Sequence, residues 1–391
     1  MMARGELPPG GYIFTCRFLR RHWGCCPPPN RSSSECSGRC TGRPASISRS
    51  RPTRGGCWRL AIAGPVWPRT SLVNSRGCEG DGSLTSPPPA VDRVRPPAEL
   101  RSTVMKLRTA LTLARASNLP TVWTNVLVGV AIVGQPVPLS AIFGLLVGLS
   151  AMYCGGMFLN DACDLDFDRR ERPERPLARG DVGLAEVWFA GLGLLVVGIV
   201  ACGVVASDSG PGWLAGAGPA FLLAVTIVLY DVHHRHNRWA AWVMGSCRGL
   251  TYCVCARALG APVDAELALA VAVIVIYVAG LTAVARFEVG RGRPSWRAKL
   301  GVWVPWLVYG PGLAFTFAGV FAGLGLVYLV DCLGDLTRRD RPVGATVARL
   351  VAAISLVDAL LLASLGRYDW AWLAVAALPL CRRFQRRVPG T

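Results

Sequence analysis

A cluster of acidic side chains in the middle of the chain is the strongest candidate for chemistry. It follows an apolar run, residues 141–159, and consists of an amide and four acids, Asn160, Asp161, Asp164, Asp166 and Asp168. If a helix continues through the cluster, every acid except Asp166 falls on one helical face, at the spacing i, i+3, i+7. Like charges on one face repel and need a cation, and hard oxygen ligands favour Mg²⁺ or Ca²⁺ over zinc.

Arginine side chains directly after the acids suit a second charged ligand. They are Arg169, Arg170, Arg172, Arg175 and Arg179. Because a guanidinium group binds phosphate with two parallel hydrogen bonds, these residues suit a phosphorylated anion held against the metal. The alternative is a solvated loop whose surface ion pairs contribute little. A metal ion with a diphosphate is our working interpretation of the residues.

The order of these residues is more specific than an isolated pair of acids. The pattern Asn-Asp-x-x-Asp-x-x-x-Asp, followed by Arg175-Pro176-Leu177 and Gly180, resembles the first aspartate motif of the UbiA superfamily of intramembrane prenyltransferases. The resemblance covers about residues 106–365. With Tyr230-Asp231 and the variant pair Arg286 and Glu288, the chain looks like a divergent bacterial branch whose acceptor is poorly defined.

The resemblance implies roles for individual residues of the motif. The residues implied as Mg²⁺ ligands, which also bind the diphosphate of an allylic isoprenyl donor, are Asp161, Asp164 and Asp168. We expect Asn160, Arg172 and Arg175 to contact the diphosphate as well. The expected partners are therefore an isoprenyl diphosphate, a hydrophobic acceptor and the lipid bilayer, with Mg²⁺ as cofactor.

A second acidic group should face the first, because one stripe of acids cannot surround the metal ions. Members of the superfamily usually carry another DxxxD after the sixth span, where this chain has only Arg286 and Glu288. We expect Arg286 to bind phosphate directly and so to supply positive charge in place of the usual second metal ion. A competing candidate, Asp331 and Asp335, has the DxxxD spacing one loop later, and ion pairing with neighbouring arginines is its simpler explanation.

The segment after the fourth expected span supplies candidates for proton transfer. Its three histidines do not share one helical face, so a metal site is less favoured than phosphate contact or proton acceptance. The candidate proton acceptors are His234, Asp231 and Glu288. Arg248 lies at least a full turn inside an apolar segment, where a buried charge is costly and usually functional. We expect it to line the cavity and to contact the diphosphate.

The elements that must position these residues are membrane helices. With 391 residues, of which 52% are apolar and 17% charged, the chain is too apolar for an ordinary soluble protein. Apolar stretches near the roughly 17 to 25 residues of a membrane span recur along it. They are residues 119–134, 139–159, 184–206, 213–230, 239–259, 267–285, 301–317, 318–336 and 345–365, with 370–381 as a tenth span or an interfacial helix. The expected fold is an all-α transmembrane bundle of about nine spans.

Charge in the loops predicts the orientation. Residues 169–179, 233–238, 286–299 and 338–349 are basic, whereas 207–212 and 260–266 are nearly free of positive charge. This alternation places the aspartate motif on the cytoplasmic side of the cell membrane. The net charge of +18 is expected to face anionic lipid headgroups and does not argue for nucleic acid.

Composition divides the chain into three parts. Residues 1–104 are rich in Pro, Arg, Ser and Gly and read as a disordered extension. A transit peptide fits them poorly, and translation from Met105 is the favoured interpretation. Residues 105–381 form the expected prenyltransferase domain and 382–391 a basic tail.

Two functions remain open from the sequence. The first is a Mg²⁺-dependent prenyltransferase that moves an isoprenyl group to an aromatic, quinone-precursor or lipid acceptor. The second is a membrane transporter or an isoprenoid- or lipid-binding protein that keeps the fold with altered chemistry. The intact first motif favours the enzyme, and the degenerate second motif keeps the alternative open.

Overall fold

The structure is a computed structural model that describes residues 105–388 except 236, 287–295 and 337–342. Contacts divide the chain into two units, Met1–Val91 and Asp92–Thr391, and every described residue belongs to the second. The expected extension over residues 1–104 lies outside the described residues, and so does Glu288.

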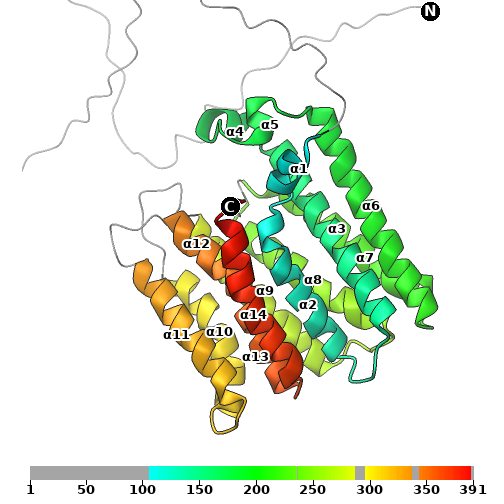
Figure 1. The fold of residues 1–391 in the computed structure, drawn as a ribbon, viewed down its shortest axis with the longest axis vertical. Coiled ribbons are helices and arrows are strands. Elements are labelled where there is room, and N and C mark those ends of the chain that lie inside the picture. The colour runs from blue at the N-terminus through cyan, green and yellow to red at the C-terminus, as the bar shows by residue number, and fades with distance from the viewer. Residues whose placement is uncertain (1–104, 236, 287–295, 337–342, 389–391) are drawn as a thin grey trace, which may run out of the picture. The chain divides into compact units, whose positions relative to one another are not determined.

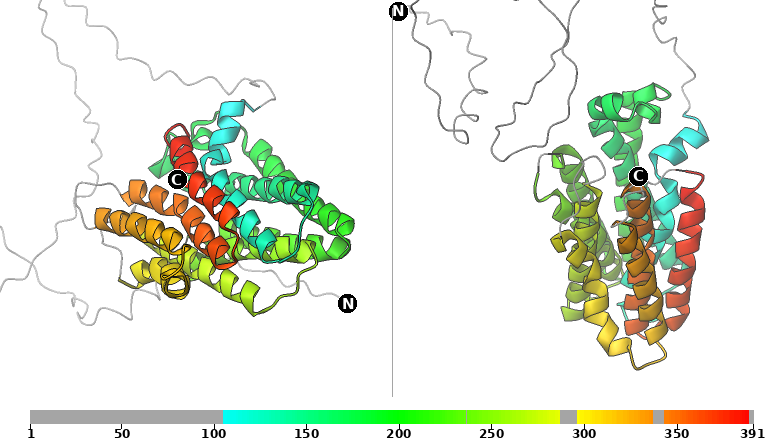
Figure 2. Two further views of the ribbon diagram at one scale, coloured as in Figure 1. Left: turned by 60° about the horizontal axis from the view of Figure 1, so that its bottom comes forward. Right: turned by 90° about the vertical axis from the view of Figure 1, so that its left-hand side faces the viewer.

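Every regular element in the described part of the chain is a helix, as expected. The order is α1 (Leu107–Leu113), η1 (Ala116–Asn118), α2 (Leu119–Ala131), α3 (Leu139–Cys163), α4 (Leu165–Glu171), α5 (Pro176–Arg179), α6 (Leu184–Asp208), α7 (Trp213–His233), α8 (Ala240–Ala258), α9 (Ala265–Ala285), α10 (Trp296–Leu313), α11 (Gly319–Asp335), α12 (Val343–Ala352), α13 (Ile354–Ser364) and α14 (Tyr368–Gln385). The long helices lie side by side in a bundle (Figures 1 and 2).

Five helical segments among the described residues are long and apolar enough to cross a membrane. They are α3, α6, α7, α9 and the continuous pair α12–α13. The helices α2, α8, α10, α11 and α14 are shorter or less apolar and pack alongside them (Figure 1). The expected count of nine spans is not confirmed by these lengths, although the multi-pass membrane bundle is.

The two least certain segments of the sequence are resolved by the helix boundaries. The apolar stretch 301–336 forms two helices, α10 and α11, as the alternation of basic loops favoured. The last segment forms α14, which packs against α13 and α2 and is therefore a helix of the bundle. It continues to Gln385, beyond the expected domain boundary at residue 381.

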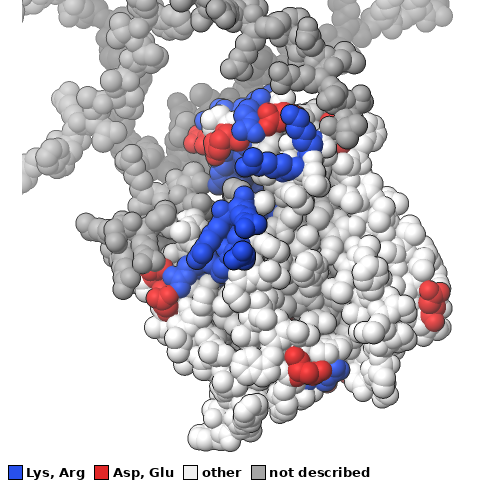
Figure 3. Space-filling model, viewed as in Figure 1, with Lys and Arg blue, Asp and Glu red and all other residues white. Residues whose placement is uncertain are grey.

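Charged side chains gather at one end of the bundle. Figure 3 shows most of the visible Lys, Arg, Asp and Glu side chains around α4 and α5 and along the C-terminal part of α14. Most of the remaining visible surface is uncharged, as a lipid-facing surface requires. The acidic motif between α3 and α4 therefore lies at the charged end (Figure 1).

The most extensive helix packing in the described part of the bundle joins α3 to α6 and depends on glycine. A Cβ atom on Gly198 of α6 would lie 2.1 Å from Cγ of Met152 and 2.7 Å from the carbonyl oxygen of Gly148, both on α3. Small residues let helix backbones approach this closely in membranes. This contact holds the helix that ends in the acidic motif, so α6 supports the position of the site.

We predict that Gly198→Ala destabilises the protein although alanine is the better helix former. The added methyl group collides with the α3 backbone, and overpacking of this kind costs about 1–3 kcal/mol, against a gain of at most about 1 kcal/mol in helix propensity. Gly193→Ala is the matched control, because a Cβ atom there meets nothing within 4 Å. Thermal unfolding in detergent should give a lower Tm for Gly198→Ala alone, and equal Tm values would contradict the packing argument.

Candidate active site at the end of α3

A break in the helix arranges the acidic motif. Helix α3 ends at Cys163, and Asp164, with φ −91° and ψ 0°, separates it from α4. The uninterrupted helix assumed from the sequence is therefore absent. Asp161 and Asp168 still meet, because both accept hydrogen bonds from Nη1 of Arg175, at 3.1 and 2.8 Å. Asp166 is exposed and points elsewhere, as expected.

Asp164 binds the segment between α7 and α8 instead of Arg175. Its Oδ1 accepts hydrogen bonds from Nε and Nη2 of Arg235, at 2.8 and 2.7 Å. The same oxygen lies 3.4 Å from Nε2 of His234. The basic segment that the sequence placed at the phosphates is thus held against the motif by Asp164.

Arg115 is a member of the site that the sequence did not reveal. Its Nη2 donates to Oδ1 of Asn160 at 3.3 Å and to Oδ1 of Asp161 at 3.1 Å. Its backbone adopts φ 45°, a left-handed conformation that is uncommon outside glycine and marks a constrained position. Burial alone would lower the pKa of Arg115, but the charge of Asp161 and its neighbours holds that pKa above its ordinary value.

Opposed effects set the protonation of the remaining motif acids. Burial raises the pKa of Asp168 above its ordinary value, and Arg175 only partly offsets this. Burial acts in the same direction on Asp164, but the hydrogen bond and charge of His234 and those of Arg235 outweigh it and lower its pKa. The site therefore combines one carboxylate that is firmly ionised with one that holds its proton more readily.

His234 is polarised towards its charged form. Its Nε2 faces Asp164, and its Nδ1 lies 3.1 Å from the backbone oxygen of Asp231. A neutral imidazole can donate from only one nitrogen, so two acceptors favour the protonated ring. The hydrogen bond to Asp164 is the main cause that raises the pKa of His234, with burial opposing it. The ring also stacks on Tyr230, with centroids 5.1 Å apart.

Binding of a divalent cation by these acids depends on how many of their oxygen atoms converge and are free to coordinate it. In the part of the chain that the structure describes, no three His, Cys, Asp or Glu side chains converge closely enough to hold a metal ion. Asp161 and Asp168 do converge, with Arg175 between them, and Oδ1 of Asp168 is buried without a hydrogen-bond partner in the described part of the chain. Two hard carboxylates with one unsatisfied oxygen fit Mg²⁺ once the guanidinium group moves aside.

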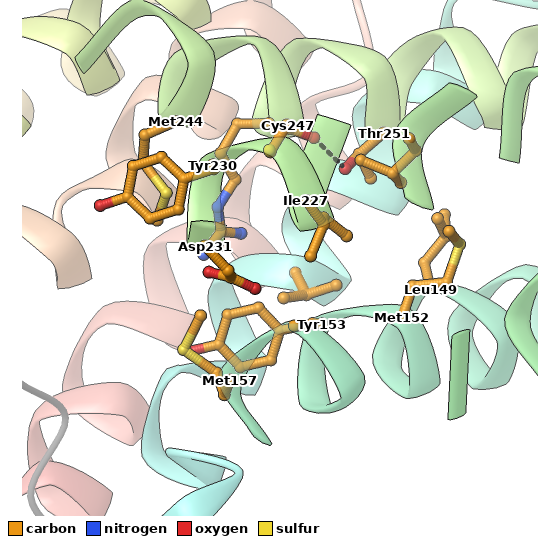
Figure 4. Close-up of a pocket in the computed structure, with 14 residues that line it drawn as sticks. Leu149, Met152, Tyr153, Met157, Ile227, Tyr230, Asp231, Met244, Cys247 and Thr251 are labelled. Carbon is orange, nitrogen blue, oxygen red and sulfur yellow. Dashed lines mark hydrogen bonds between the residues drawn. The ribbon is translucent and has the colours of Figure 1, made fainter. Parts of the chain in front are cut away.

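A small cavity of about 60 Å³ lies next to the motif, between α3, α7 and α8. Figure 4 shows Asp231 on its wall with Tyr153, Met157 and Tyr230 around it. Asp231 is buried, and its Oδ1 accepts a hydrogen bond from Nδ2 of Asn160 at 3.1 Å. Its Oδ2 has no hydrogen-bond partner among the described residues. Asn160 thus joins the acidic motif to the acid that lines the cavity.

Arg248 also lines this cavity, as its place inside an apolar segment predicted. The side chain is 8% exposed, and its guanidinium donates to Oδ1 of Asn125 at 2.8 Å and to Oγ1 of Thr121 at 3.2 Å. It also lies 5.4 Å from the ring centroid of Tyr153. The remaining surface of the guanidinium is available to a ligand in the cavity.

The other expected site residues lie apart from this cluster. Arg172 caps α4 and makes no side-chain hydrogen bond or ion pair with the described residues. Nη2 of Arg286 donates to the backbone oxygen of Asn237 at 2.8 Å and touches none of the motif acids. Asp331 and Asp335 both pair with Arg349 of α12, which supports ion pairing as their role.

Two further residues escaped the sequence reasoning, and the chain held a signal for one of them. Asp358 lies well inside the apolar stretch 345–365, and intramembrane acids are usually functional. Arg235 is one of several basic residues in its segment, and nothing in the sequence separates it from its neighbours. Only the fold shows that it reaches Asp164.

We predict that the contact between His234 and Asp164 makes stability depend on pH. Because the folded pKa of His234 lies above about 6.5, its contribution is complete below that pH and is lost as the pH rises through the folded pKa. Asp164, with a lowered pKa, contributes above about pH 3.8 and loses its contribution on further acidification. The Tm difference between the native chain and His234→Gln should therefore be larger near pH ~6 than near pH ~9.

The control for this measurement is the adjacent His233→Gln, since His233 is exposed. Its Tm should follow that of the native chain at both pH values. A Tm difference for His234→Gln that stays constant with pH would contradict the charged contact.

Comparison with known proteins places this geometry in a family. The sequence model of the UbiA prenyltransferase family matches residues 121–337. A digeranylgeranylglyceryl phosphate synthase from Ignicoccus hospitalis is 37% identical over 93 residues, which are 24% of this chain and 30% of that protein. The chain thus spans about a third of the length of this curated relative.

Solved structures with similar folds are more distant in sequence. One is described as giving insights into the biosynthesis of digeranylgeranylglyceryl phosphate synthase in membranes, with 16% identity, a TM-score of 0.46 and coverage of 71% of this chain and 100% of that one. Another is a UbiA homologue from Archaeoglobus fulgidus bound to DMAPP and Mg²⁺, with 11% identity, a TM-score of 0.40 and coverage of 70% and 98%. The family match extends over more than half of the chain and includes the acidic motif, the cavity and Arg248, and the chain therefore belongs to the UbiA prenyltransferase family.

Proposed function

We propose that the protein is a membrane prenyltransferase that moves an isoprenyl group from an allylic isoprenyl diphosphate to a hydrophobic acceptor. The observation that carries the proposal is the joined site at the end of α3. There, Asp161 and Asp168 share Arg175, Arg115 donates to both Asp161 and Asn160, and Asn160 donates to Asp231 on the cavity wall. The acceptor class that suits such a cavity is an aromatic compound, a quinone precursor or a lipid.

In this proposal the motif acids hold the metal and the arginines hold the diphosphate. The proposed Mg²⁺ ligands are Asp161, Asp164 and Asp168, of which Asp161 and Asp168 share Arg175 and Asp164 pairs with Arg235. Bound Mg²⁺ supplies positive charge that stabilises the diphosphate as a leaving group. Arg115 and Arg175 already lie against the motif, and their guanidinium groups can turn from carboxylate to phosphate oxygens.

The proposed reaction breaks one bond and forms another. The C–O bond between the isoprenyl group and the diphosphate breaks, and its electron pair leaves with the diphosphate. Arginine side chains at the motif stabilise this charge more in the transition state than in the ground state. The acceptor forms the new bond to the isoprenyl carbon and gives up a proton.

Asp231 is the proton acceptor that the geometry favours. It lines the cavity and its Oδ2 has no hydrogen-bond partner within the residues that the structure describes, so it can take a proton from the acceptor. His234 is engaged by Asp164, and its proposed role is to hold the motif acid in place. Glu288 lies outside the described residues and stays a candidate. Arg172 and Arg286 remain proposed contacts of the diphosphate, and their side chains would have to move towards a bound donor to reach it.

We further propose that the protein lies in the cell membrane with the motif on the cytoplasmic side. The basic connections at the motif end of the bundle support this orientation, because positive loops are retained in the cytoplasm. The gathering of charged side chains around α4, α5 and the end of α14 agrees with it.

We predict that Asp168→Asn abolishes turnover while Asp166→Asn does not. Purified full-length protein in detergent is incubated with Mg²⁺, geranyl, farnesyl or geranylgeranyl diphosphate, and an extract of lipids and quinone precursors. Pyrophosphate release and prenylated products, followed by mass spectrometry, should fall about 100-fold or more for Asp168→Asn and on addition of EDTA. Asp166→Asn is the matched control, because the Asp166 side chain is 89% exposed and pairs with Arg169, whereas Arg175 pairs with Asp161 and Asp168.

The outcomes of this experiment separate the candidate functions. A product that is lost with Asp168→Asn and with EDTA establishes the transferase and identifies its acceptor. Mg²⁺-dependent donor binding without turnover favours a binding or transport protein. Absence of donor binding contradicts the site assignment.

We predict that Arg175→Gln raises the affinity for a divalent cation. The guanidinium group competes with the metal for Asp161 and Asp168, and its removal leaves two carboxylates that attract a cation more strongly. Titration with Mn²⁺, followed by electron paramagnetic resonance, should show binding tightened by about tenfold. Arg179→Gln is the control, since Arg179 is exposed and pairs with Asp181. Unchanged Mn²⁺ affinity in Arg175→Gln would show that these acids do not hold the metal.

A further inference from the structure

A fully buried acid lies within the bundle, away from the aspartate motif. Asp358 belongs to α13, and its side chain is 0% exposed. It accepts hydrogen bonds from Oγ1 of Thr124 at 2.5 Å, from Nδ2 of Asn125 at 3.0 and 2.9 Å, and from the hydroxyl of Tyr252 at 2.5 Å. A charge at such a position is costly and persists where it has a function. The proposed reaction assigns it none.

The side-chain amide of Asn125 connects this acid to the cavity. Its Nδ2 donates to Asp358, and its Oδ1 accepts from Nη1 of Arg248 at 2.8 Å. A carboxylate can only accept and a guanidinium can only donate, so the two neighbours permit one orientation of the amide. In turn the amide oxygen fixes one edge of the guanidinium, and Oγ1 of Thr121 fixes another.

The hydrogen bonds from Arg248 through Asn125 to Asp358 also bring a negative charge close to a buried positive one. Among the described residues Arg248 makes no direct ion pair, and a lone guanidinium in the bundle would be strongly disfavoured. Asp358 lies behind it, one amide away, and supplies the opposite charge without covering the face that lines the cavity.

We propose that Asp358 is a positioning residue, which acts through Asn125 to hold the Arg248 guanidinium on the cavity wall and to balance its charge there. The inference rests on the proposed function, in which Arg248 contacts the diphosphate donor. It adds a part of the site on α2 and α13, two helices that carry none of the residues of the aspartate motif.

Binding of geranyl diphosphate tests the proposal. The affinity is measured by titration calorimetry on the detergent-solubilised full chain with Mg²⁺, for Asp358→Asn, Arg248→Met and the double variant. If Asp358 acts through Arg248, Asp358→Asn should weaken binding by about tenfold, and it should have no further effect when Arg248 is already methionine. A merely structural acid would weaken binding by the same factor in both backgrounds, or in neither, and either result overturns the proposal.

Matched variants control for general damage to the buried helices. Ser355→Ala removes a fully buried hydroxyl from α13, which among the described residues donates a hydrogen bond to the backbone oxygen of Ala352. Tyr277→Phe is the counterpart of Tyr252→Phe, because both tyrosines are fully buried but Tyr277 donates to the backbone oxygen of Leu350. Affinity should fall with Tyr252→Phe and stay within about twofold of native for both controls.

A second measurement keeps the proposal testable if the native chain does not bind geranyl diphosphate. That result contradicts the proposed function, and the thermal stability of the same three variants then decides the role of Asp358. The Tm changes of Asp358→Asn and Arg248→Met should be strongly non-additive, whereas those of Ser355→Ala and Arg248→Met should add. Additive changes for Asp358 and Arg248 overturn the connection between them.

Discussion

The neutralisation of acids at the membrane boundary is the constraint on which the rest of this structure depends. Asp161, Asp164 and Asp168 lie within a few residues of each other at the end of an apolar helix, and without cations they would repel each other. The chain supplies guanidinium groups from three separate segments, through Arg115, Arg175 and Arg235. At the helix break, Asp164 pairs with Arg235, whereas Asp161 and Asp168 share Arg175.

The same rule operates deeper in the bundle with fewer charges. Arg248 and Asp358 form one positive and one negative centre, which an amide and hydroxyl groups connect. At the membrane boundary the carboxylates and guanidinium groups are in direct contact, so an incoming cation can replace a guanidinium group and an incoming anion can replace a carboxylate. Inside, the charges are held apart, so the positive one keeps a face towards the cavity.

Much of the architecture and part of the site could be predicted from the sequence, for a physical reason. Apolar stretches of spanning length and alternating basic loops are local signals, and they gave an all-α bundle and the division of residues 301–336 into two helices. The position of the motif at a helix end and of Arg248 inside the bundle could be predicted in the same way, because charge next to or inside an apolar run is visible in one dimension, whereas the roles of these residues stay predictions. Arg115 and Arg235 were not found, because their importance lies in contacts with acids 46 and 71 residues away. The break at Asp164 was also missed, because no glycine or proline marks it in the sequence.

The polar contacts of α2 have a consequence for how the molecule is made. Thr124 and Asn125 find their partner in Asp358, more than 230 residues later, and Asn118 at the start of α2 accepts a hydrogen bond from Gln385 near the end of the chain. The first helix of the bundle is therefore synthesised long before the groups that satisfy its polar side chains exist. During that interval these side chains must be held by water, lipid headgroups or an insertion factor. Assembly of the cavity wall is thus a late event, which waits for the last two helices to leave the ribosome.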